Sequence, residues 1–374
     1  MFGLMLTPLF VCIGFYLYFF IKRIYKTFSK KAFSRKNKII ISAISSFLAV
    51  FCYSVSGIYV VFILHLVFIS AFFMLCNFLI KKVFGEKYEK GFNAWKKIHG
   101  SGALAVVLTV GILTVGYVNM HNVVKTEYEI KTDKNIRDEG YRIALLADVH
   151  FGVSLDEKEL FEVCERVSGD NPDVVILCGD IVDDDTSASE MKTVFEILGK
   201  IKSKYGIFYV YGNHDRPFSM VSSDYTEDEL VQAINSNGIK ILKDEVYSIN
   251  NELFIVGRDD VGFDAHPRKS IKSLIENTDE NGFVLTLDHR PTEYKENGEA
   301  GTDLLLSGHT HGGQIWPVNL IDKAFKINDA NYGLVKIDED TNAIVTSGVA
   351  GWAYPVKTSA PAEYVIIDVS TGNK

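Results

Sequence analysis

Long runs without a charged residue constrain this chain more than any other feature of its sequence. Residues 3–21 and 102–118 form two such runs, and residues 39–80 form a third of 42 residues. A membrane-spanning helix needs about 20 mainly apolar residues, so the long run fits two spans joined by a turn. Ser54–Gly57 is the natural place for that turn. The sequence therefore predicts a transmembrane region at residues 1–118 with four helices, at about 3–21, 39–56, 59–80 and 102–118.

The charge of the chain is divided between this region and the rest. Residues 1–118 carry 14 Lys or Arg and 2 Glu, whereas residues 119–374 carry 25 Lys or Arg and 45 Asp or Glu. The basic residues of the front lie in two linking segments, 22–38 and 81–97. Lys and Arg are retained on the cytoplasmic side of a membrane. We therefore expect a multi-pass protein of the cell membrane whose residues after 118 are extracytoplasmic.

The acidic part is expected to fold as an α/β domain. Residues 119–140 read as a linker with an entry strand, and from residue 141 apolar strand-like runs alternate with helical patterns. One predicted helix, Thr226–Asn235, opens with the capping-box pattern Thr226-x-x-Glu229. Alternation of this kind favours a sheet covered by helices. The sequence therefore predicts a separate α/β domain at residues 141–374.

Potential metal ligands follow five of the predicted strands directly. They are Asp148 and His150 after residues 141–147, Asp180 and Asp183 after 173–178, Asn213 and His214 after 207–211, His289 after 283–287, and His309 and His311 after 304–306. Open α/β sheets bind their ligands outside the carboxyl ends of the strands. Five of the nine histidines of the chain lie at these positions, which indicates a common site.

The segment Asp303–Pro317, DLLLSGHTHGGQIWP, contains the most informative pair. Its apolar start predicts a buried strand, and the glycines that follow permit a positive φ. Side chains two apart on extended backbone point to the same side. We therefore expect His309 and His311 to point the same way, as a His-x-His pair that binds zinc, iron or manganese.

The ordered blocks D-x-H, G-D-x-x-D, G-N-H-D, a lone His and G-H-x-H resemble the calcineurin-like metallophosphoesterase superfamily over roughly residues 141–369. The block GHTHGGQIWP and the attached membrane segments are similar to the membrane-linked bacterial subgroup. This resemblance implies a four-layer α/β/β/α sandwich with two metal ions at its rim.

The resemblance also implies which residues hold the two metals. One ion would be held by Asp148, His150, Asp180 and His311, and the other by Asp180, Asn213, His289 and His309, with Asp180 bridging. Two carboxylates among neutral ligands leave such a site net positive, so that it attracts phosphate and makes hydroxide from bound water. The mixed oxygen and imidazole set favours manganese, iron or zinc.

Residues beside these ligands are candidates for catalysis and substrate binding. His214 is the histidine left without a metal, and it could protonate the leaving oxygen. Asp183 matches the position that orients this histidine in the family, whereas Asp184 is expected to be solvated. Arg216 and Arg290 each follow a ligand block, and either bind a substrate phosphate or form surface ion pairs.

These observations predict a membrane-anchored phosphoesterase that depends on two divalent transition-metal ions. Its substrates would be phosphate esters or pyrophosphates of the cell envelope, including lipid-linked ones, with monoester and diester both open. A phosphoprotein or nucleotide phosphatase with the same site is the alternative, and a metal-binding sensor without catalysis is a second one. An acidic domain argues against nucleic acid as a partner, and the sequence indicates no protein partner.

Overall fold

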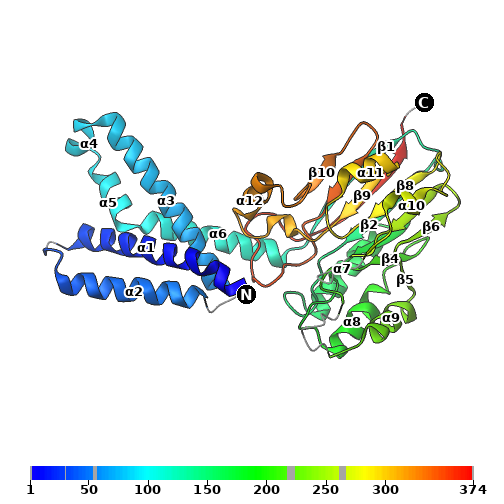
Figure 1. The fold of residues 1–374 in the computed structure, drawn as a ribbon, viewed down its shortest axis with the longest axis horizontal. Helices are drawn as coiled ribbons and strands as arrows, with labels where there is room; N and C mark the ends of the chain where they lie inside the picture. Colours follow the sequence, from blue (N-terminus) through cyan, green and yellow to red (C-terminus); the bar gives the residue numbers. More distant parts are fainter. Residues whose placement is uncertain (1, 30, 54–56, 217–223, 261–266, 373–374) are drawn as a thin grey trace. The chain divides into compact units, whose positions relative to one another are not determined.

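The computed structural model describes the chain except residues 1, 30, 54–56, 217–223, 261–266 and 373–374 (Figure 1). It divides into two compact units, residues 1–115 and residues 116–374. The boundary predicted from the sequence lies after residue 118. Each unit is described by itself below.

The first unit is helical. It consists of α1 (Phe2–Phe28), α2 (Arg35–Tyr53), α3 (Ile58–Phe84), α4 (Glu86–Lys90), α5 (Asn93–Ser101) and the beginning of α6 (Ala103–His121). Among the described residues, three helices are long and apolar enough to cross a membrane, and they are Thr7–Phe28, Ile58–Phe84 and Ala103–His121.

The other predicted span, residues 39–56, lies on α2 and ends outside the described residues. Most of the predicted turn, residues 54–56, also lies outside them. Four spans therefore stay a prediction.

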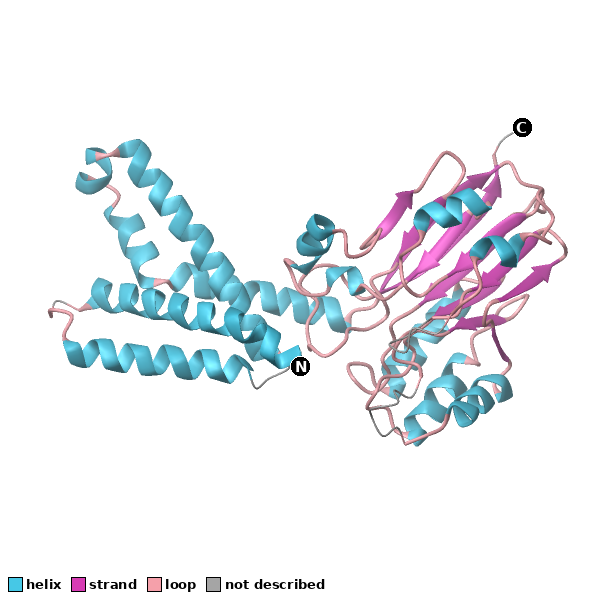
Figure 2. Cartoon of the chain, viewed as in Figure 1, coloured by secondary structure: helices cyan, strands magenta, loops and turns pink. Residues whose placement is uncertain are grey.

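The second unit is built on two six-stranded sheets (Figure 2). The first has the order β1-β12-β2-β3-β4-β5 and the second the order β10-β11-β9-β8-β7-β6. The strands of the first sheet are β1 (Val124–Thr132), β2 (Tyr141–Leu146), β3 (Val174–Cys178), β4 (Ile207–Val210), β5 (Ile239–Ile241) and β12 (Glu363–Thr371). Those of the second are β6 (Glu245–Ile249), β7 (Leu253–Gly257), β8 (Phe283–Leu287), β9 (Leu304–Ser307), β10 (Gly333–Lys336) and β11 (Asn342–Val345).

The central strands read as unbroken apolar runs because both of their faces are buried. In β2, Ile143 and Leu145 belong to a hydrophobic core that also contains Leu285 and Leu306 of the second sheet. The alternate residue Leu146 belongs to a second core, shared with helices. Successive side chains of a strand point to opposite faces, so one strand serves both cores.

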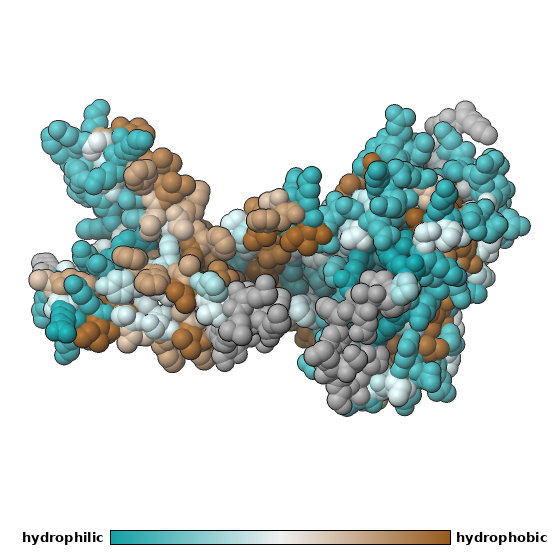
Figure 3. Space-filling view, in the orientation of Figure 1, coloured by the Kyte–Doolittle hydropathy of each residue, from teal (hydrophilic) through white to brown (hydrophobic). Residues whose placement is uncertain are grey.

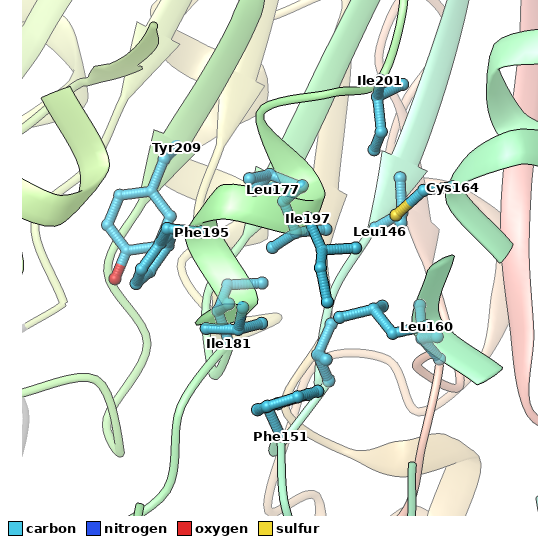
Figure 4. Packing of buried hydrophobic residues seen from close by; sticks show 14 of the residues in the cluster. Leu146, Phe151, Leu160, Cys164, Leu177, Ile181, Phe195, Ile197, Ile201 and Tyr209 are labelled. Carbon is cyan, nitrogen blue, oxygen red and sulfur yellow. The ribbon is translucent and has the colours of Figure 1, made fainter. Parts of the chain in front are cut away.

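The helices pack on this second core, which Figure 4 shows from close by. It joins Leu146 and Leu177 of the first sheet to Leu160 of α7 (Glu157–Gly169) and Phe195 of α8 (Ala188–Leu198). The predicted capping box of α9 (Glu227–Ser236) is confirmed, with Thr226 accepting from the backbone N–H of Glu229. The remaining helices are α10 (Ile271–Ile275), α11 (Tyr294–Ala300), the 3-10 turn η1 (His311–Gly313) and α12 (Val318–Phe325).

The predicted entry strand pairs with the far end of the chain. Strand β1 lies parallel to β12, with Val124 opposite Glu363 and Thr132 opposite Thr371. Strand β12 in turn pairs antiparallel with β2, where Arg142 faces Asp368. The Arg142 guanidinium donates to both carboxylate oxygens of Asp368, at 2.7 and 2.8 Å. The first and last strands of the second unit therefore lie side by side at one edge of its first sheet.

Candidate metal centre

The residues that follow the parallel strands meet at the carboxyl ends of the two sheets. Strands β2, β3 and β4 are parallel neighbours in one sheet, and β7, β8 and β9 are parallel neighbours in the other. Parallel neighbours present their carboxyl ends at one edge, where open α/β sheets bind ligands. Two groups of potential metal ligands form there: Asp148, His150 and His311, and Asp180, His289 and His309. Asp183, Asp184 and His214 make a third such group beside them.

The first group is compact and buried. Its ligand atoms lie within 4.8 Å of one another. Nε2 of His150 is 3.2 Å from Nε2 of His311, which is 3.5 Å from Oδ1 of Asp148. The backbone N–H of His309 donates to both carboxylate oxygens of Asp148, at 3.0 and 3.1 Å. The loop that carries both histidines of the His-x-His pair therefore also orients this carboxylate.

Asp180 connects the two groups. Its Oδ2 is 3.0 Å from Nε2 of His289 in the second group and 3.7 Å from Nε2 of His150 in the first. Its Oδ1 accepts from the backbone N–H of His214 at 2.8 Å. The carboxylate is buried. One carboxylate thus faces both histidine groups, which is the position expected of a bridging ligand.

Several donor atoms fit a metal ion because they are buried and otherwise unused. Nδ1 of His289 lies 2.8 Å from the carbonyl oxygen of Cys178, so an N–H there leaves the lone pair on Nε2. Among the described residues, Oδ1 of Asn213 and Nδ1 of His311 have no hydrogen-bond partner, whereas Nε2 of His289 faces the Asp180 carboxylate at 3.0 Å. A hydrogen bond on the far nitrogen is the usual way in which a ligating histidine is oriented.

The protonation of the histidines also fits. Burial lowers the pKa of His309 to about 3, and burial also lowers the pKa of His311. Both rings are therefore neutral at pH 7, which is the form that binds a metal. Burial favours the neutral form of His289 as well, but the nearby Asp180 carboxylate raises its pKa to about 10. A metal ion would displace that proton from Nε2.

The backbone of the site is strained, and one expectation about it is wrong. Asp148, His150, Asp180, His309 and His311 all have φ between 38° and 70°, in the left-handed region that few non-glycine residues adopt. Such strain gathers at functional sites. Strand β9 ends at Ser307, before the His-x-His pair. The two histidines are therefore not on extended backbone, and each belongs to a different group.

His214 lies beside both groups in contact with two carboxylates. Its Nδ1 is 3.3 Å from Oδ1 of Asp183 and 3.2 Å from Oδ2 of Asp184. Its ring is 5.3 Å from that of His150 and 5.2 Å from that of Trp352, between centroids. Burial lowers the pKa of His214, but the bond to Asp184 and the neighbouring carboxylates raise it to about 9. Asp184, which was expected to be solvated, is exposed, and its carboxylate also contacts His214.

The two candidate substrate-binding arginines are both in ion pairs. The Arg290 guanidinium donates to both carboxylate oxygens of Asp260, at 2.8 and 3.3 Å. Arg216 pairs with Asp259 and donates to the carbonyl oxygen of Asp260 at 2.9 Å. Its guanidinium also lies 4.4 Å from the centre of the Tyr211 ring. The ion-pair alternative therefore describes the observed contacts, and contact with a substrate stays a prediction.

Two further residues of the site have roles that the sequence did not predict. Asp215 is fully buried and accepts from four backbone N–H groups, two of them those of Asp180 and Gly212. Its place in the block G-N-H-D was the available signal. Lys357 is also fully buried, and its ammonium donates to the carbonyl oxygens of Ser347 and Ala350. Its two carbonyl acceptors lie ten and seven residues earlier in the chain, in an irregular segment with no helix or strand pattern to reveal a buried lysine.

Comparison with known proteins agrees with this geometry. The family model of the calcineurin-like phosphoesterases matches residues 141–313, which contain all the candidate ligands. The chain therefore contains a calcineurin-like phosphoesterase domain at residues 141–313, the kind of domain found in metal-dependent phosphoester hydrolases.

Relatives with this domain include membrane proteins. The chain is 28% identical over 271 residues to a transmembrane protein with metallophosphoesterase domain from Danio rerio, covering 70% of this chain and 60% of that protein. It is 29% identical over 272 residues to an uncharacterized metallophosphoesterase from Campylobacter jejuni, covering 71% of this chain and 68% of that one. It is 32% identical over 178 residues to the uncharacterized metallophosphoesterase YkoQ from Bacillus subtilis, covering 46% and 62%. The match thus spans about 60% of the length of the Danio rerio relative.

Proposed function

We propose that this chain is a membrane-anchored hydrolase of phosphate esters or pyrophosphates that uses two divalent transition-metal ions. The observation that carries the proposal is the position of Asp180, whose Oδ2 faces His289 at 3.0 Å and His150 at 3.7 Å. A carboxylate between two buried histidine groups is suited to bridging two ions. The four-layer α/β/β/α sandwich belongs to the same proposal, supported by separate cores between the sheets and between sheets and helices.

Seven residues would hold the ions. They are Asp148, His150, Asp180, Asn213, His289, His309 and His311. Manganese, iron or zinc suits this mixture of carboxylate, amide and imidazole donors. When bound, such ions attract phosphate and lower the pKa of a bound water.

The protein's own contribution to the reaction centres on His214. Its Nδ1 is held by Asp183 and Asp184, so that Nε2 is the nitrogen left to face a substrate. A protonated His214 can donate from Nε2 to the leaving oxygen, as general acids do. Asp183 also lies 3.4 Å from Nδ1 of His150, so it orients a ligand and the acid together.

The expected position of the domain at the membrane suggests which class of substrate it meets. Three described helices can span a bilayer. With the fourth predicted span, both basic linking segments lie on the same side of the membrane, and the positive-inside rule then supports an extracytoplasmic site. Phosphate esters of the envelope, including lipid-linked ones, are the substrates within reach of a domain in that position. A phosphoprotein or nucleotide phosphatase with the same residues is the alternative, and a substrate panel separates the two.

The test uses the full-length protein in detergent, stripped of metal and restored with manganese, zinc or iron. We expect turnover of a chromogenic phosphomonoester or diester that depends on the added metal, with two ions bound per chain. Asp180→Ala should abolish turnover, whereas Asp185→Ala, which changes an exposed carboxylate of the same loop, should not. Absence of bound metal, or equal turnover in Asp180→Ala, would refute the proposal.

A further inference from the structure

The short helix α12 has its apolar side outside. Within its eight residues, the one buried residue is Asp322. Leu320 is 54% exposed and Phe325 is 76% exposed, and Ile327 just beyond the helix is 64% exposed. We define the α12 face as the exposed apolar side chains of this segment: Trp316, Val318, Leu320, Ile321, Phe325 and Ile327. Figure 3 shows apolar side chains gathered over α12.

The polar contacts of α12 keep its apolar side chains exposed. The Asp322 carboxylate accepts from the backbone N–H of Asn328 at 3.0 Å and from the side-chain amide of Asn331 at 2.6 Å. These bonds hold the carboxylate inward and the apolar residues outward. A helix on a water-soluble domain normally shows the opposite arrangement. An apolar patch of this kind marks a surface that meets something other than water.

The end of a candidate membrane span lies in the same unit as α12. The last turns of α6, residues 116–121, are hydrogen-bonded to the loop that precedes β12. The N–H of Lys357 donates to the carbonyl oxygen of Gly116 at 2.9 Å, and the N–H of Ala362 donates to that of Asn119 at 2.8 Å. Because α6 can span a bilayer, this loop lies where the chain leaves the membrane.

The segment before α12 is attached to that same loop. The N–H of Thr358 donates to the carbonyl oxygen of Gln314 at 2.8 Å, and the N–H of Trp316 donates to Oγ1 of Thr358 at 2.9 Å. The α12 face therefore begins one hydrogen bond from the loop that holds the end of α6.

The loop also reaches the candidate catalytic centre. Trp352 donates its backbone N–H to Oε1 of Gln314 at 2.9 Å, and its ring lies against His214. On the other side, η1 begins at the candidate ligand His311 and packs on α12. A side chain on Gly313 would meet the backbone nitrogen of Asn319 at 2.7 Å. Two short connections, one through Gln314 and Trp352 and one through η1, thus join the α12 face to the metal groups.

We propose that the α12 face lies in the membrane surface, with its apolar side chains at the boundary between headgroups and acyl chains. The occupant of this face is the lipid surface itself. Amphipathic helices bind membranes in this way when their apolar side is exposed. Resting on the proposed function, the inference gives the substrate class: a phosphate ester carried at headgroup depth by a lipid. Trp352 and His214 are the protein side chains that would lie beside the phosphate ester of such a lipid.

Depth in the membrane is measured without reference to activity. In full-length protein with Cys12→Ser and Cys76→Ser, which removes the free cysteines that are not buried, Phe325→Cys receives an environment-sensitive fluorophore. Phe161→Cys, which replaces an exposed apolar residue of α7, is the matched control. The proteins are reconstituted in phosphatidylcholine and phosphatidylglycerol vesicles with or without brominated acyl chains.

We expect blue-shifted emission that brominated lipids quench at position 325 and not at position 161. Emission at 325 that stays water-like would overturn the proposal. Shielding that rises with the protein-to-lipid ratio and resists brominated lipids would place a second copy on the face, and would also overturn it.

Activity tests the substrate class separately. Ile321→Asn with Phe325→Ser should leave turnover of a soluble chromogenic ester unchanged. Hydrolysis of a diacylglycerol phosphate ester in the same vesicles should fall about tenfold or more, because two anchoring side chains are lost. Phe161→Ser should change neither rate. Equal loss of both rates, or of neither, would refute the role in presenting lipid. Quenching at 325 without turnover of either ester would uphold the membrane contact and refute the proposed function instead.

Discussion

Replacement of Asp215 by Asn tests whether one buried carboxylate holds the metal loops in place. Oδ1 of Asp215 accepts from the backbone N–H groups of Ile181 and Val182, at 2.7 and 3.1 Å. Oδ2 accepts from those of Asp180 and Gly212, at 2.7 and 2.6 Å. The loop after β3 and the loop after β4 are therefore tied to the same side chain.

An asparagine keeps the shape but can accept through one oxygen only. Two backbone N–H groups would then face an amide NH2 group, and each hydrogen bond to a charged acceptor contributes about 1.5–3 kcal/mol. Burial, and after it the Asp180 charge, raises the pKa of Asp215, which shows that the charged form is costly to bury. A neutral amide avoids this cost, and that offsets part of the free energy lost with the hydrogen bonds. We expect a net decrease of about 2–4 kcal/mol in the free energy of unfolding, or roughly 5–15 °C in Tm.

The assay is thermal unfolding of the full-length protein in detergent, with metal content measured on the same samples. Asp185→Asn is the control, since it makes the same chemical change at an exposed carboxylate nearby. Asp215→Asn should also bind less metal, because the Asp180 backbone is no longer held. A Tm within about 1 °C of the unchanged protein, with full metal content, would refute the reasoning.

Three further outcomes are expected. His214→Ala should lower turnover by about 10²–10⁴-fold with metal content unchanged, because His214 is proposed as an acid and not as a ligand; loss of metal would contradict that role. Gly212→Ala should abolish metal binding, because the new Cβ would overlap Oδ1 of Asp180, and elemental analysis of folded protein checks this. Removal of metal by a chelator should lower Tm. If the free metal concentration is 100 times its Kd before removal, the loss of stabilisation is about 2.7 kcal/mol. An unchanged Tm would mean that the ions do not bind the native fold.

Much of the site was predictable because its signals are local. Each candidate ligand follows an apolar run within a few residues, and the end of a strand can be recognised from the run itself. The helix starts were predictable for the same reason, as the capping box at Thr226 shows. The uncharged runs likewise required no knowledge of contacts, since span length follows from the thickness of a bilayer.

The remaining features depend on contacts between residues far apart in the chain. The sequence could not show that β1 pairs with β12 or that Arg290 is bound by Asp260. Residue types and their spacing predicted the class of chemistry and the candidate membrane spans. Tertiary structure alone decided the distances of Asp180 from the two histidine groups and the inside-out helix α12, because these depend on the partners that folding brings to each side chain.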